Sequence, residues 1–114
     1  MRVLDVSIEA DQDFDDILTF SAVQFGFAAS TRYAALIGQA FNDLTENPAR
    51  PGTVASDDLP QGIHIYPIRY SRDRVPPPDR VGHPRHVIVF RFDDFAVQIV
   101  RILHDAMDFP RHLN

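Results

Sequence analysis

The chain has 114 residues, of which 45% are hydrophobic and 24% are charged, and it contains no cysteine. These fractions are typical of a folded globular protein, so we expect a single domain over residues 1–114 without disulfides. The net charge of −5 argues against a protein that binds nucleic-acid phosphates over its whole surface. We see no membrane-spanning segment and no secretion signal, and we therefore expect a cytoplasmic protein.

Charge is distributed unevenly along the chain. Residues 1–61 carry ten acidic side chains and three arginines, whereas residues 62–114 carry eight arginines and six aspartates. We therefore expect an acidic partner to contact the second half. All eleven basic residues are arginine, which leaves no amine for Schiff-base chemistry and favours bidentate contacts to carboxylates or phosphates. Genome base composition produces the same bias, and the sequence leaves this alternative open.

The first half of the chain predicts a strand followed by two helices. Residues 2–8 have partly alternating apolar side chains, as in a short strand. Apolar positions then recur at helical spacing from Ala10 to Gly26, and again from Gly26 to Asn47. Two helices joined at a single glycine indicate an antiparallel hairpin. The expected apolar stripes are Phe14, Ile17, Leu18 and Phe25 in the first helix and Tyr33, Ala34, Ile37, Phe41 and Leu44 in the second.

Four aspartates crowd the start of the first helix, and at first sight they suggest a metal site. They are Asp11, Asp13, Asp15 and Asp16. Neighbouring helical positions point around the axis and do not converge on one ion, whereas the helix dipole favours acids in the first turns. We therefore interpret the cluster as a solvated helix start.

The second half predicts three strands. Apolar side chains occupy every second position in residues 62–70, but the alternation shifts by one residue beside Pro67, which indicates a bulge or an edge strand. Residues 71–84 are expected to form a long, exposed, arginine-rich loop. Residues 85–92 are almost wholly apolar, as in a central strand buried on both faces. After a tight turn, residues 95–104 form the last strand.

Pairing the last two strands about a turn at Asp93-Asp94 gives one apolar face to receive the helices. This register places Phe92 opposite Phe95, Phe90 opposite Val97 and Ile88 opposite Ile99. The other face is expected to show a mixed set of side chains, namely Arg91, Gln98, Val87, Val89, Val100, Ile102 and His104. The predicted fold is α+β, in the order β-α-α-β-β-β, with an N-terminal helical hairpin packed on one face of an antiparallel sheet.

The C-terminal segment places His104, Asp108 and His112 four residues apart, a spacing that would align metal ligands on a helix. Pro110 would break that helix, so we expect no metal and no cofactor. We expect His104 to bond a carboxylate or a backbone group instead. Arg101 is predicted to lie opposite His86, where it either pairs with an acid of the first helix or ends the sheet exposed.

The element order and several segments resemble the ParE/RelE superfamily of type II toxins, over about Ser7 to Leu113. The segments are "SIEADQDFDDIL", Gly26, "FNDLTENP", "GIHIYPIRY" and "RHVIVFRF", followed by "VQIVRILHDAMDFPRHL". In this order and spacing they are a specific signal. The resemblance implies the RelE/ParE-like fold and a toxin that an antitoxin neutralises.

Two activities occur in the superfamily. RelE-like members are ribosome-dependent mRNA endonucleases, and such cleavage needs a base, an acid and clustered cations. Arg91 matches a superfamily arginine, and His86 and His104 titrate near neutrality in their unperturbed state. However, Phe109 stands where RelE-like members often have a tyrosine, and the chain has no lysine. The nuclease therefore remains the alternative.

The ending "RILHDAMDFPRHL" is similar to the ParE pattern. That resemblance implies a non-enzymatic toxin that binds DNA gyrase and is neutralised by a ParD-like ribbon-helix-helix antitoxin, with DNA contacted only through the antitoxin complex and no membrane partner. A degenerate member kept only for autorepression is a third possibility. A disordered antitoxin extension could add a strand at an edge such as residues 62–70.

We predict that antitoxin or target contacts come from the open sheet face, the arginine-rich hairpin and the C-terminal tail. The predicted residues are Arg69, Arg72, Arg85, Arg91, Gln98, His104, Met107, Phe109 and Arg111. None is expected to be catalytic. The arginines of this set equally fit a solvated loop.

Overall fold

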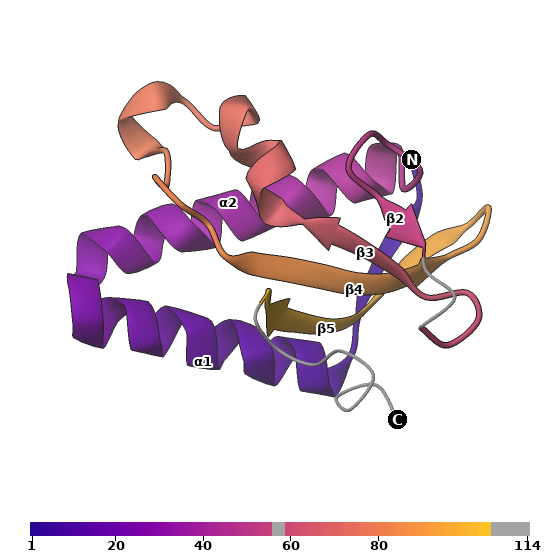
Figure 1. Cartoon of the computed structure of the whole chain (residues 1–114), viewed down its shortest axis with the longest axis horizontal. Coiled ribbons are helices and arrows are strands. Elements are labelled where there is room, and N and C mark those ends of the chain that lie inside the picture. Colours follow the sequence, from indigo (N-terminus) through magenta and orange to yellow (C-terminus); the bar gives the residue numbers. More distant parts are fainter. Residues whose placement is uncertain (56–58, 106–114) are drawn as a thin grey trace.

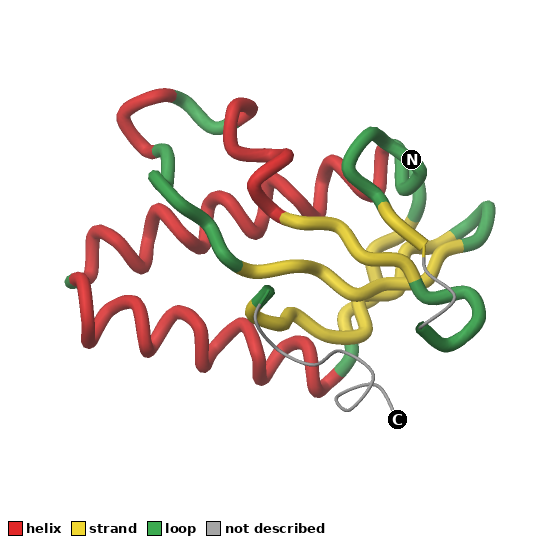
Figure 2. Tube along the Cα trace, viewed as in Figure 1, coloured by secondary structure: helices red, strands yellow, loops and turns green. Residues whose placement is uncertain are grey.

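A mixed five-stranded sheet organises the protein, and the computed structural model describes residues 1–55 and 59–105 (Figures 1 and 2). The strands are β1 (Val3–Val6), β2 (Val54–Ala55), β3 (His64–Pro67), β4 (His86–Phe92) and β5 (Ala96–His104), in the order β1-β5-β4-β3-β2. β1 runs parallel to β5, and all other neighbours are antiparallel. The predicted α+β fold is confirmed, but the sheet is mixed rather than antiparallel because β1 runs parallel to β5, and the short β2 is a strand that the predicted order lacked.

The helical hairpin is also confirmed. α1 (Ile8–Phe25) and α2 (Phe27–Glu46) meet at Gly26, whose φ of 95° lies in the region that favours glycine. Ser7 caps α1 because its hydroxyl oxygen accepts the Ala10 N–H at 2.9 Å. Neither helix combines the length and the apolar character needed to cross a bilayer, as far as the described residues go.

The main core lies between this hairpin and the sheet. Its buried members are Ala10, Leu36, Ile37, Ala40, Leu44, Tyr66, Ile68, Val75, Ile88, Phe90, Val97, Ile99 and Ile102. Phe14 and Ile17 pack against it as predicted, but Phe25 is 73% exposed and does not. Phe25 is the last residue of α1, and the tip of the hairpin extends past the ends of β4 and β5 (Figure 1).

A second apolar cluster lies on the other face of the sheet. It consists of Ile63, Val87, Val89 and Leu103, with Leu59, Ile65 and Val100 packed against it. Along β4, side chains alternate between this cluster and the main core, and residues 87–90 are all buried. The prediction of a central strand buried on both faces is confirmed, and Val87 and Val89 are not surface residues.

The turn between β4 and β5 is longer than predicted. The Asp93 carboxylate accepts the N–H groups of Phe95 and Ala96, both at 2.8 Å, so four residues close the turn instead of two. Phe95 is consequently 80% exposed and has no partner in β4. The observed register pairs Phe92 with Val97, Phe90 with Ile99 and Ile88 with Ile102, and the predicted register is wrong.

A β-bulge at Val100 changes the phase of β5. Val89 lies opposite Arg101 while its neighbour Phe90 lies opposite Ile99, which leaves Val100 as the extra residue. The bulge brings Ile102 to the helix-facing side, where the predicted alternation did not place it. It also pairs His86 with His104, so Arg101 does not lie opposite His86 as predicted.

Arg101 bonds an acid of the first helix, one of the two arrangements predicted for it. Its Nε and Nη2 donate to the two carboxylate oxygens of Asp13 at 2.7 and 2.9 Å. The same carboxylate accepts the Ile102 N–H at 2.9 Å. β1 pairs with β5 only as far as Ile99, so no strand supplies an acceptor for the Ile102 N–H. The Asp13 carboxylate supplies that acceptor instead. One member of the aspartate cluster therefore has a structural partner.

The segment after β3 is folded rather than a free loop. The strand ends at Pro67, and a 3₁₀ helix follows over Ile68–Arg74, with a second one over Pro77–Asp79. Ser71 and Val75 are buried, which contradicts the prediction of an exposed loop over residues 71–84. Proline lacks the N–H that would continue the ladder, and Ile68 turns into the main core instead.

A buried carboxylate anchors this segment to α2. Asp43 is fully buried and accepts hydrogen bonds from Ser71 Oγ at 2.6 Å and Gln39 Nε2 at 2.9 Å. It also pairs with Arg74 at 2.9 Å and Arg50 at 3.2 Å. A charged carboxylate is tolerated in a core only because both of its oxygens contact hydrogen-bond donors.

Replacing Asp43 by asparagine tests this anchor. The substitution removes the charge and turns one of the two acceptor oxygens into a donor that faces two donors, because each oxygen accepts two contacts. We therefore expect Asp43→Asn to lower the free energy of unfolding by roughly 2–4 kcal/mol in urea denaturation. Glu46, exposed and 3.6 Å from Arg74, is the control, and Glu46→Gln should cost less than about 1 kcal/mol. Equal effects of the two substitutions would argue against the anchor.

Candidate partner-binding site

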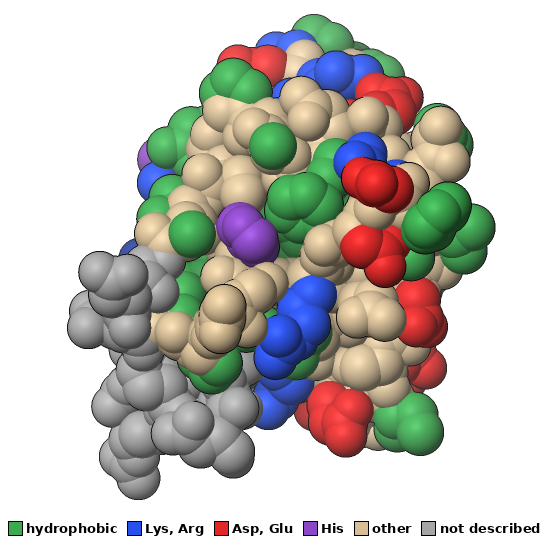
Figure 3. All heavy atoms as spheres, turned by 90° about the vertical axis from the view of Figure 1, so that its right-hand side faces the viewer, with side chains coloured by type: hydrophobic (Ala, Val, Ile, Leu, Met, Phe, Trp, Pro, Cys, Tyr) green, Lys and Arg blue, Asp and Glu red, His purple; other side chains and the backbone are tan. Residues whose placement is uncertain are grey.

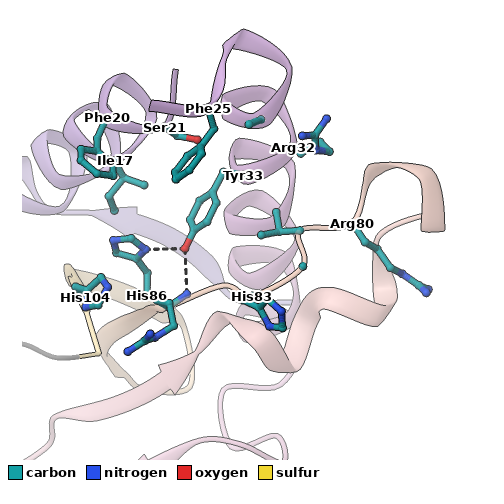
Figure 4. Close-up of a pocket in the computed structure, with 14 residues that line it drawn as sticks. Ile17, Phe20, Ser21, Phe25, Arg32, Tyr33, Arg80, His83, His86 and His104 are labelled. Atoms are coloured by element: carbon teal, nitrogen blue, oxygen red, sulfur yellow. Dashed lines mark hydrogen bonds between the residues drawn. The ribbon is translucent and has the colours of Figure 1, made fainter. Parts of the chain in front are cut away.

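A pocket of about 520 Å³ opens where the hairpin tip overruns the sheet (Figure 4). We call it the tip pocket. α1 and its end contribute Ile17, Phe20, Ser21 and Phe25, and α2 contributes Ala29, Arg32 and Tyr33. The segment that leads into β4 and the end of β5 contribute Arg80, Val81, Gly82, His83, Arg85, His86 and His104. The lining is predominantly apolar, with cationic and imidazole groups around it.

A tyrosine and two histidines form the polar part of the lining. The Tyr33 hydroxyl lies 2.6 Å from His86 Nδ1, and it accepts the Arg85 N–H at 3.4 Å (Figure 4). The His86 ring meets the His104 ring edge-on with centroids 5.3 Å apart. Burial, followed by the neighbouring His104, lowers the pKa of His86 to about 4. His86 is therefore neutral at physiological pH, and its Nδ1 accepts a hydrogen bond from the Tyr33 hydroxyl.

Burial also raises the pKa of Tyr33, so its hydroxyl stays protonated. Beside the pair, the Arg85 guanidinium donates to both carboxylate oxygens of Asp105 at 2.8 and 2.9 Å. These hydrogen bonds hold the pKa of Asp105 below its ordinary value. His104 Nδ1 lies 3.3 Å from the same carboxylate, as expected of a histidine that bonds a carboxylate.

Arg91 and Gln98 lie opposite each other at the far end of the β4–β5 hairpin. Arg91 donates from Nη1 to the Gln61 carbonyl oxygen at 2.9 Å, beside a shallow depression of about 250 Å³. Acidic and basic side chains are interspersed over this end of the molecule (Figure 3). Arg91 is five residue steps along β4 from His86, which pairs with His104, so about 16 Å lies between Arg91 and this histidine pair.

The arginines of the segment after β3 have local roles. Arg72 Nε donates to the Val81 carbonyl oxygen at 2.6 Å, and Arg80 donates to the carbonyl oxygens of Val75 and Asp73 at 2.8 and 2.9 Å. The Arg69 guanidinium stacks over the Tyr70 ring at 4.9 Å. Arg72 therefore fastens its own segment, while Arg69 is exposed. Met107, Phe109 and Arg111 lie outside the described residues, as do Asp108 and His112.

Two exposed apolar surfaces were missed by sequence reasoning. The outer edge of β1 carries Val3, Leu4 and Val6, exposed by 69, 39 and 36%, and the helix that follows begins with Ile8. The hairpin tip carries Phe20, Val23, Phe25 and Phe27, exposed by 63 to 82%. The sequence contains a signal for the tip, since residues 17–31 include no charged side chain. Exposed apolar clusters of this kind mark interaction surfaces.

The lowered pKa of His86 makes a prediction about pH. An unfolded histidine binds a proton near pH 6.5 and the folded one only near 4, so stability should fall as the pH falls through this window. Partial solvent screening limits the loss to about 1–2 kcal/mol. In urea denaturation, His86→Gln should lose less stability between pH 6.5 and 4 than the wild type, with the exposed His83→Gln as matched control. The same pH dependence in His86→Gln and wild type would contradict a neutral buried His86.

Comparisons with known proteins agree with this fold. The family model described as "ParE toxin of type II toxin-antitoxin system, parDE" matches residues 4–109. No match was found among curated proteins. A solved structure of a chromosomal ParDE toxin–antitoxin system from P. aeruginosa is similar to this chain, with 17% identity and a TM-score of 0.68 over 91% of this chain and 96% of that one. At that identity the structural likeness establishes a shared fold, whereas the sequence match is to the family itself. The chain therefore belongs to the ParE toxin family of type II toxin–antitoxin systems.

Proposed function

We propose that this protein is a growth-inhibiting toxin of the cytoplasm that binds DNA gyrase and is neutralised by a ParD-like ribbon-helix-helix antitoxin. The observation that carries the proposal is the match of the ParE toxin family over residues 4–109. The ending of the chain, similar to the ParE pattern, supports gyrase as the target. DNA is contacted only through the antitoxin complex, and the toxin itself performs no chemistry.

The positions of the candidate catalytic groups support protein binding over RNA cleavage. An in-line cleavage needs a base and a cation within reach of one phosphate. Arg91 lies about 16 Å along the strands from the histidine pair and bonds the Gln61 carbonyl. Arg85 lies beside the pair, but its charge is offset by the Asp105 carboxylate, to which it donates two hydrogen bonds. The net charge of −5 also opposes docking on ribosomal RNA. The exposed apolar surfaces, by contrast, are what a protein partner covers.

The antitoxin is proposed to add a strand along β1 rather than along residues 62–70. β2 already pairs with β3 at His64 and Ile65, so that edge is covered where the sequence prediction expected it to be free. The N–H groups of Val3 and Ser7 bond β5, so by alternation those of Leu4 and Val6 point outward. An extended antitoxin segment would pair with these groups and cover the apolar side chains of β1.

Purified toxin should convert supercoiled plasmid to linear DNA in the presence of gyrase and leave mRNA intact in a parallel translation assay. Linear DNA is expected because a toxin that traps gyrase prevents the enzyme from resealing the DNA that it has cleaved. Cut mRNA with unaffected gyrase would contradict the proposal and favour the endonuclease alternative. Normal growth of cells that express the toxin without antitoxin would favour a degenerate member kept for autorepression.

Leu4→Pro tests the antitoxin edge because it removes an outward N–H without touching the β1–β5 ladder. We expect roughly tenfold weaker binding of the cognate antitoxin by calorimetry, the effect of one lost hydrogen bond at an interface. Leu4→Thr, which keeps the N–H, should bind nearly as the wild type does, and thermal unfolding checks that both variants fold. Unchanged affinity in Leu4→Pro would place the antitoxin elsewhere.

A further inference from the structure

The outer edge of β1 carries one charged side chain in the middle of an exposed apolar strand. Asp5 lies between Leu4 and Val6, and all four residues of β1 are exposed. Asp5 pairs with Gln98 of β5, and Gln98 pairs with Arg91 of β4. These three exposed side chains therefore form a row across the sheet. A strand added along β1 would place its own side chain next to Asp5 in this row.

The row lies on the face of the sheet that the helices leave open. Val97 and Ile99, the neighbours of Gln98, belong to the main core under the helical hairpin. Because successive side chains of a strand point to opposite faces, Gln98 and its partner Asp5 project from the open face. By the same alternation, Leu4 and Val6 lie on the helix side of the edge.

The Asp5 carboxylate has no cation of its own. It makes no ion pair or hydrogen bond within residues 1–55 and 59–105. Arg2 donates from Nε to the Asp93 carbonyl oxygen at 2.6 Å, and its guanidinium lies over the Phe92 ring. Arg91 is two strands away, about 10 Å, and its guanidinium bonds the Gln61 carbonyl oxygen. The edge therefore presents an uncompensated negative charge to whatever pairs with it.

A second copy of the toxin fits this edge poorly. An antiparallel pairing that bonds the outward backbone groups of both Leu4 and Val6 places Leu4 of one copy opposite Val6 of the other. That register sets Asp5 opposite Asp5, at a position without ladder hydrogen bonds, where facing Cα atoms are only about 4.5 Å apart. Like charges at such a position destabilise the pairing, and a charge in an edge strand is a common protection against self-association.

A strand with a basic residue opposite Asp5 fits the same edge well. A lysine or arginine at that position would form a cross-strand ion pair on the open face of the sheet. The residues on either side of it would project to the helix side, where they would cover Leu4 and Val6. The complementary segment is therefore extended and has the pattern apolar, basic, apolar.

We propose that Asp5 determines which strand pairs with β1: an antitoxin segment with a lysine or arginine opposite Asp5 and apolar residues on both sides of it. The inference rests on the proposed function, because the antitoxin is the partner proposed for this edge. It adds the chemistry of the paired segment and the residue that distinguishes this segment from a second copy of the toxin.

Calorimetry of the full-length toxin with its cognate antitoxin tests the ion pair. Asp5→Lys replaces an attraction by a repulsion, so we expect roughly tenfold weaker binding at about 50 mM salt and a smaller loss at about 500 mM salt. Asp15→Lys makes the same change of charge at an exposed position of α1 and should alter the affinity less than about twofold. Both positions are at the surface, and thermal unfolding verifies that the variants fold.

Unchanged affinity in Asp5→Lys, or an equal loss in Asp15→Lys, would overturn the inference. Light scattering tests the second copy: a wild-type dimer that Leu4→Pro dissociates would assign the edge to self-association and also overturn it. The gyrase assay separates the two proposals. Gyrase trapping by a toxin whose antitoxin affinity does not depend on Asp5 would remove the inference and leave the proposed target intact. An antitoxin complex that depends on Asp5, without gyrase trapping, would do the reverse.

Discussion

The architecture depends on one irregularity, the β-bulge at Val100, and on the two side chains that fix it. The Ser7 hydroxyl, which caps α1, donates to the Val100 carbonyl oxygen at 2.8 Å, and Asp13 accepts the Ile102 N–H at 2.9 Å. Because the bulge shifts β5 by one residue, Ile102 joins the main core and His104 meets His86. Without the shift, these two side chains would face the other side of the sheet and the tip pocket would lose part of its lining.

This geometry separates the candidate sites. His83, His86 and His104 line the tip pocket at the hairpin-tip end of the sheet, whereas Arg91 lies toward the β4–β5 turn, where His64 pairs with the neighbouring Phe90. The fold also exposes two apolar surfaces of the kind that mark interaction sites. One follows β1, and the other covers the hairpin tip, where neutral His86 and Tyr33 allow an apolar pocket to contain polar groups at little cost.

The helices, the glycine between them and the buried central strand could be predicted because their apolar periodicity is strong. The bulge could not be predicted. Residues 99–103 are apolar except for Arg101, so a one-residue shift in which side chains face the core does not alter the pattern of apolar and polar residues. The turn at Asp93 was misjudged because its length depends on a side-chain hydrogen bond. The tip pocket was missed because the apolar spacing of Phe25 is the same whether or not a sheet lies beneath it.

Amide hydrogen exchange at Ile102 tests the central claim most directly, namely that Asp13 fixes the bulge and through it the tip pocket. In Asp13→Ala the Ile102 N–H loses its acceptor, so we predict roughly tenfold or greater acceleration of its exchange, together with loss of the magnetisation transfer between the His86 and His104 rings. The control Asp15→Ala should leave both unchanged. Wild-type protection of Ile102 and an intact contact between the two rings in Asp13→Ala would contradict the account.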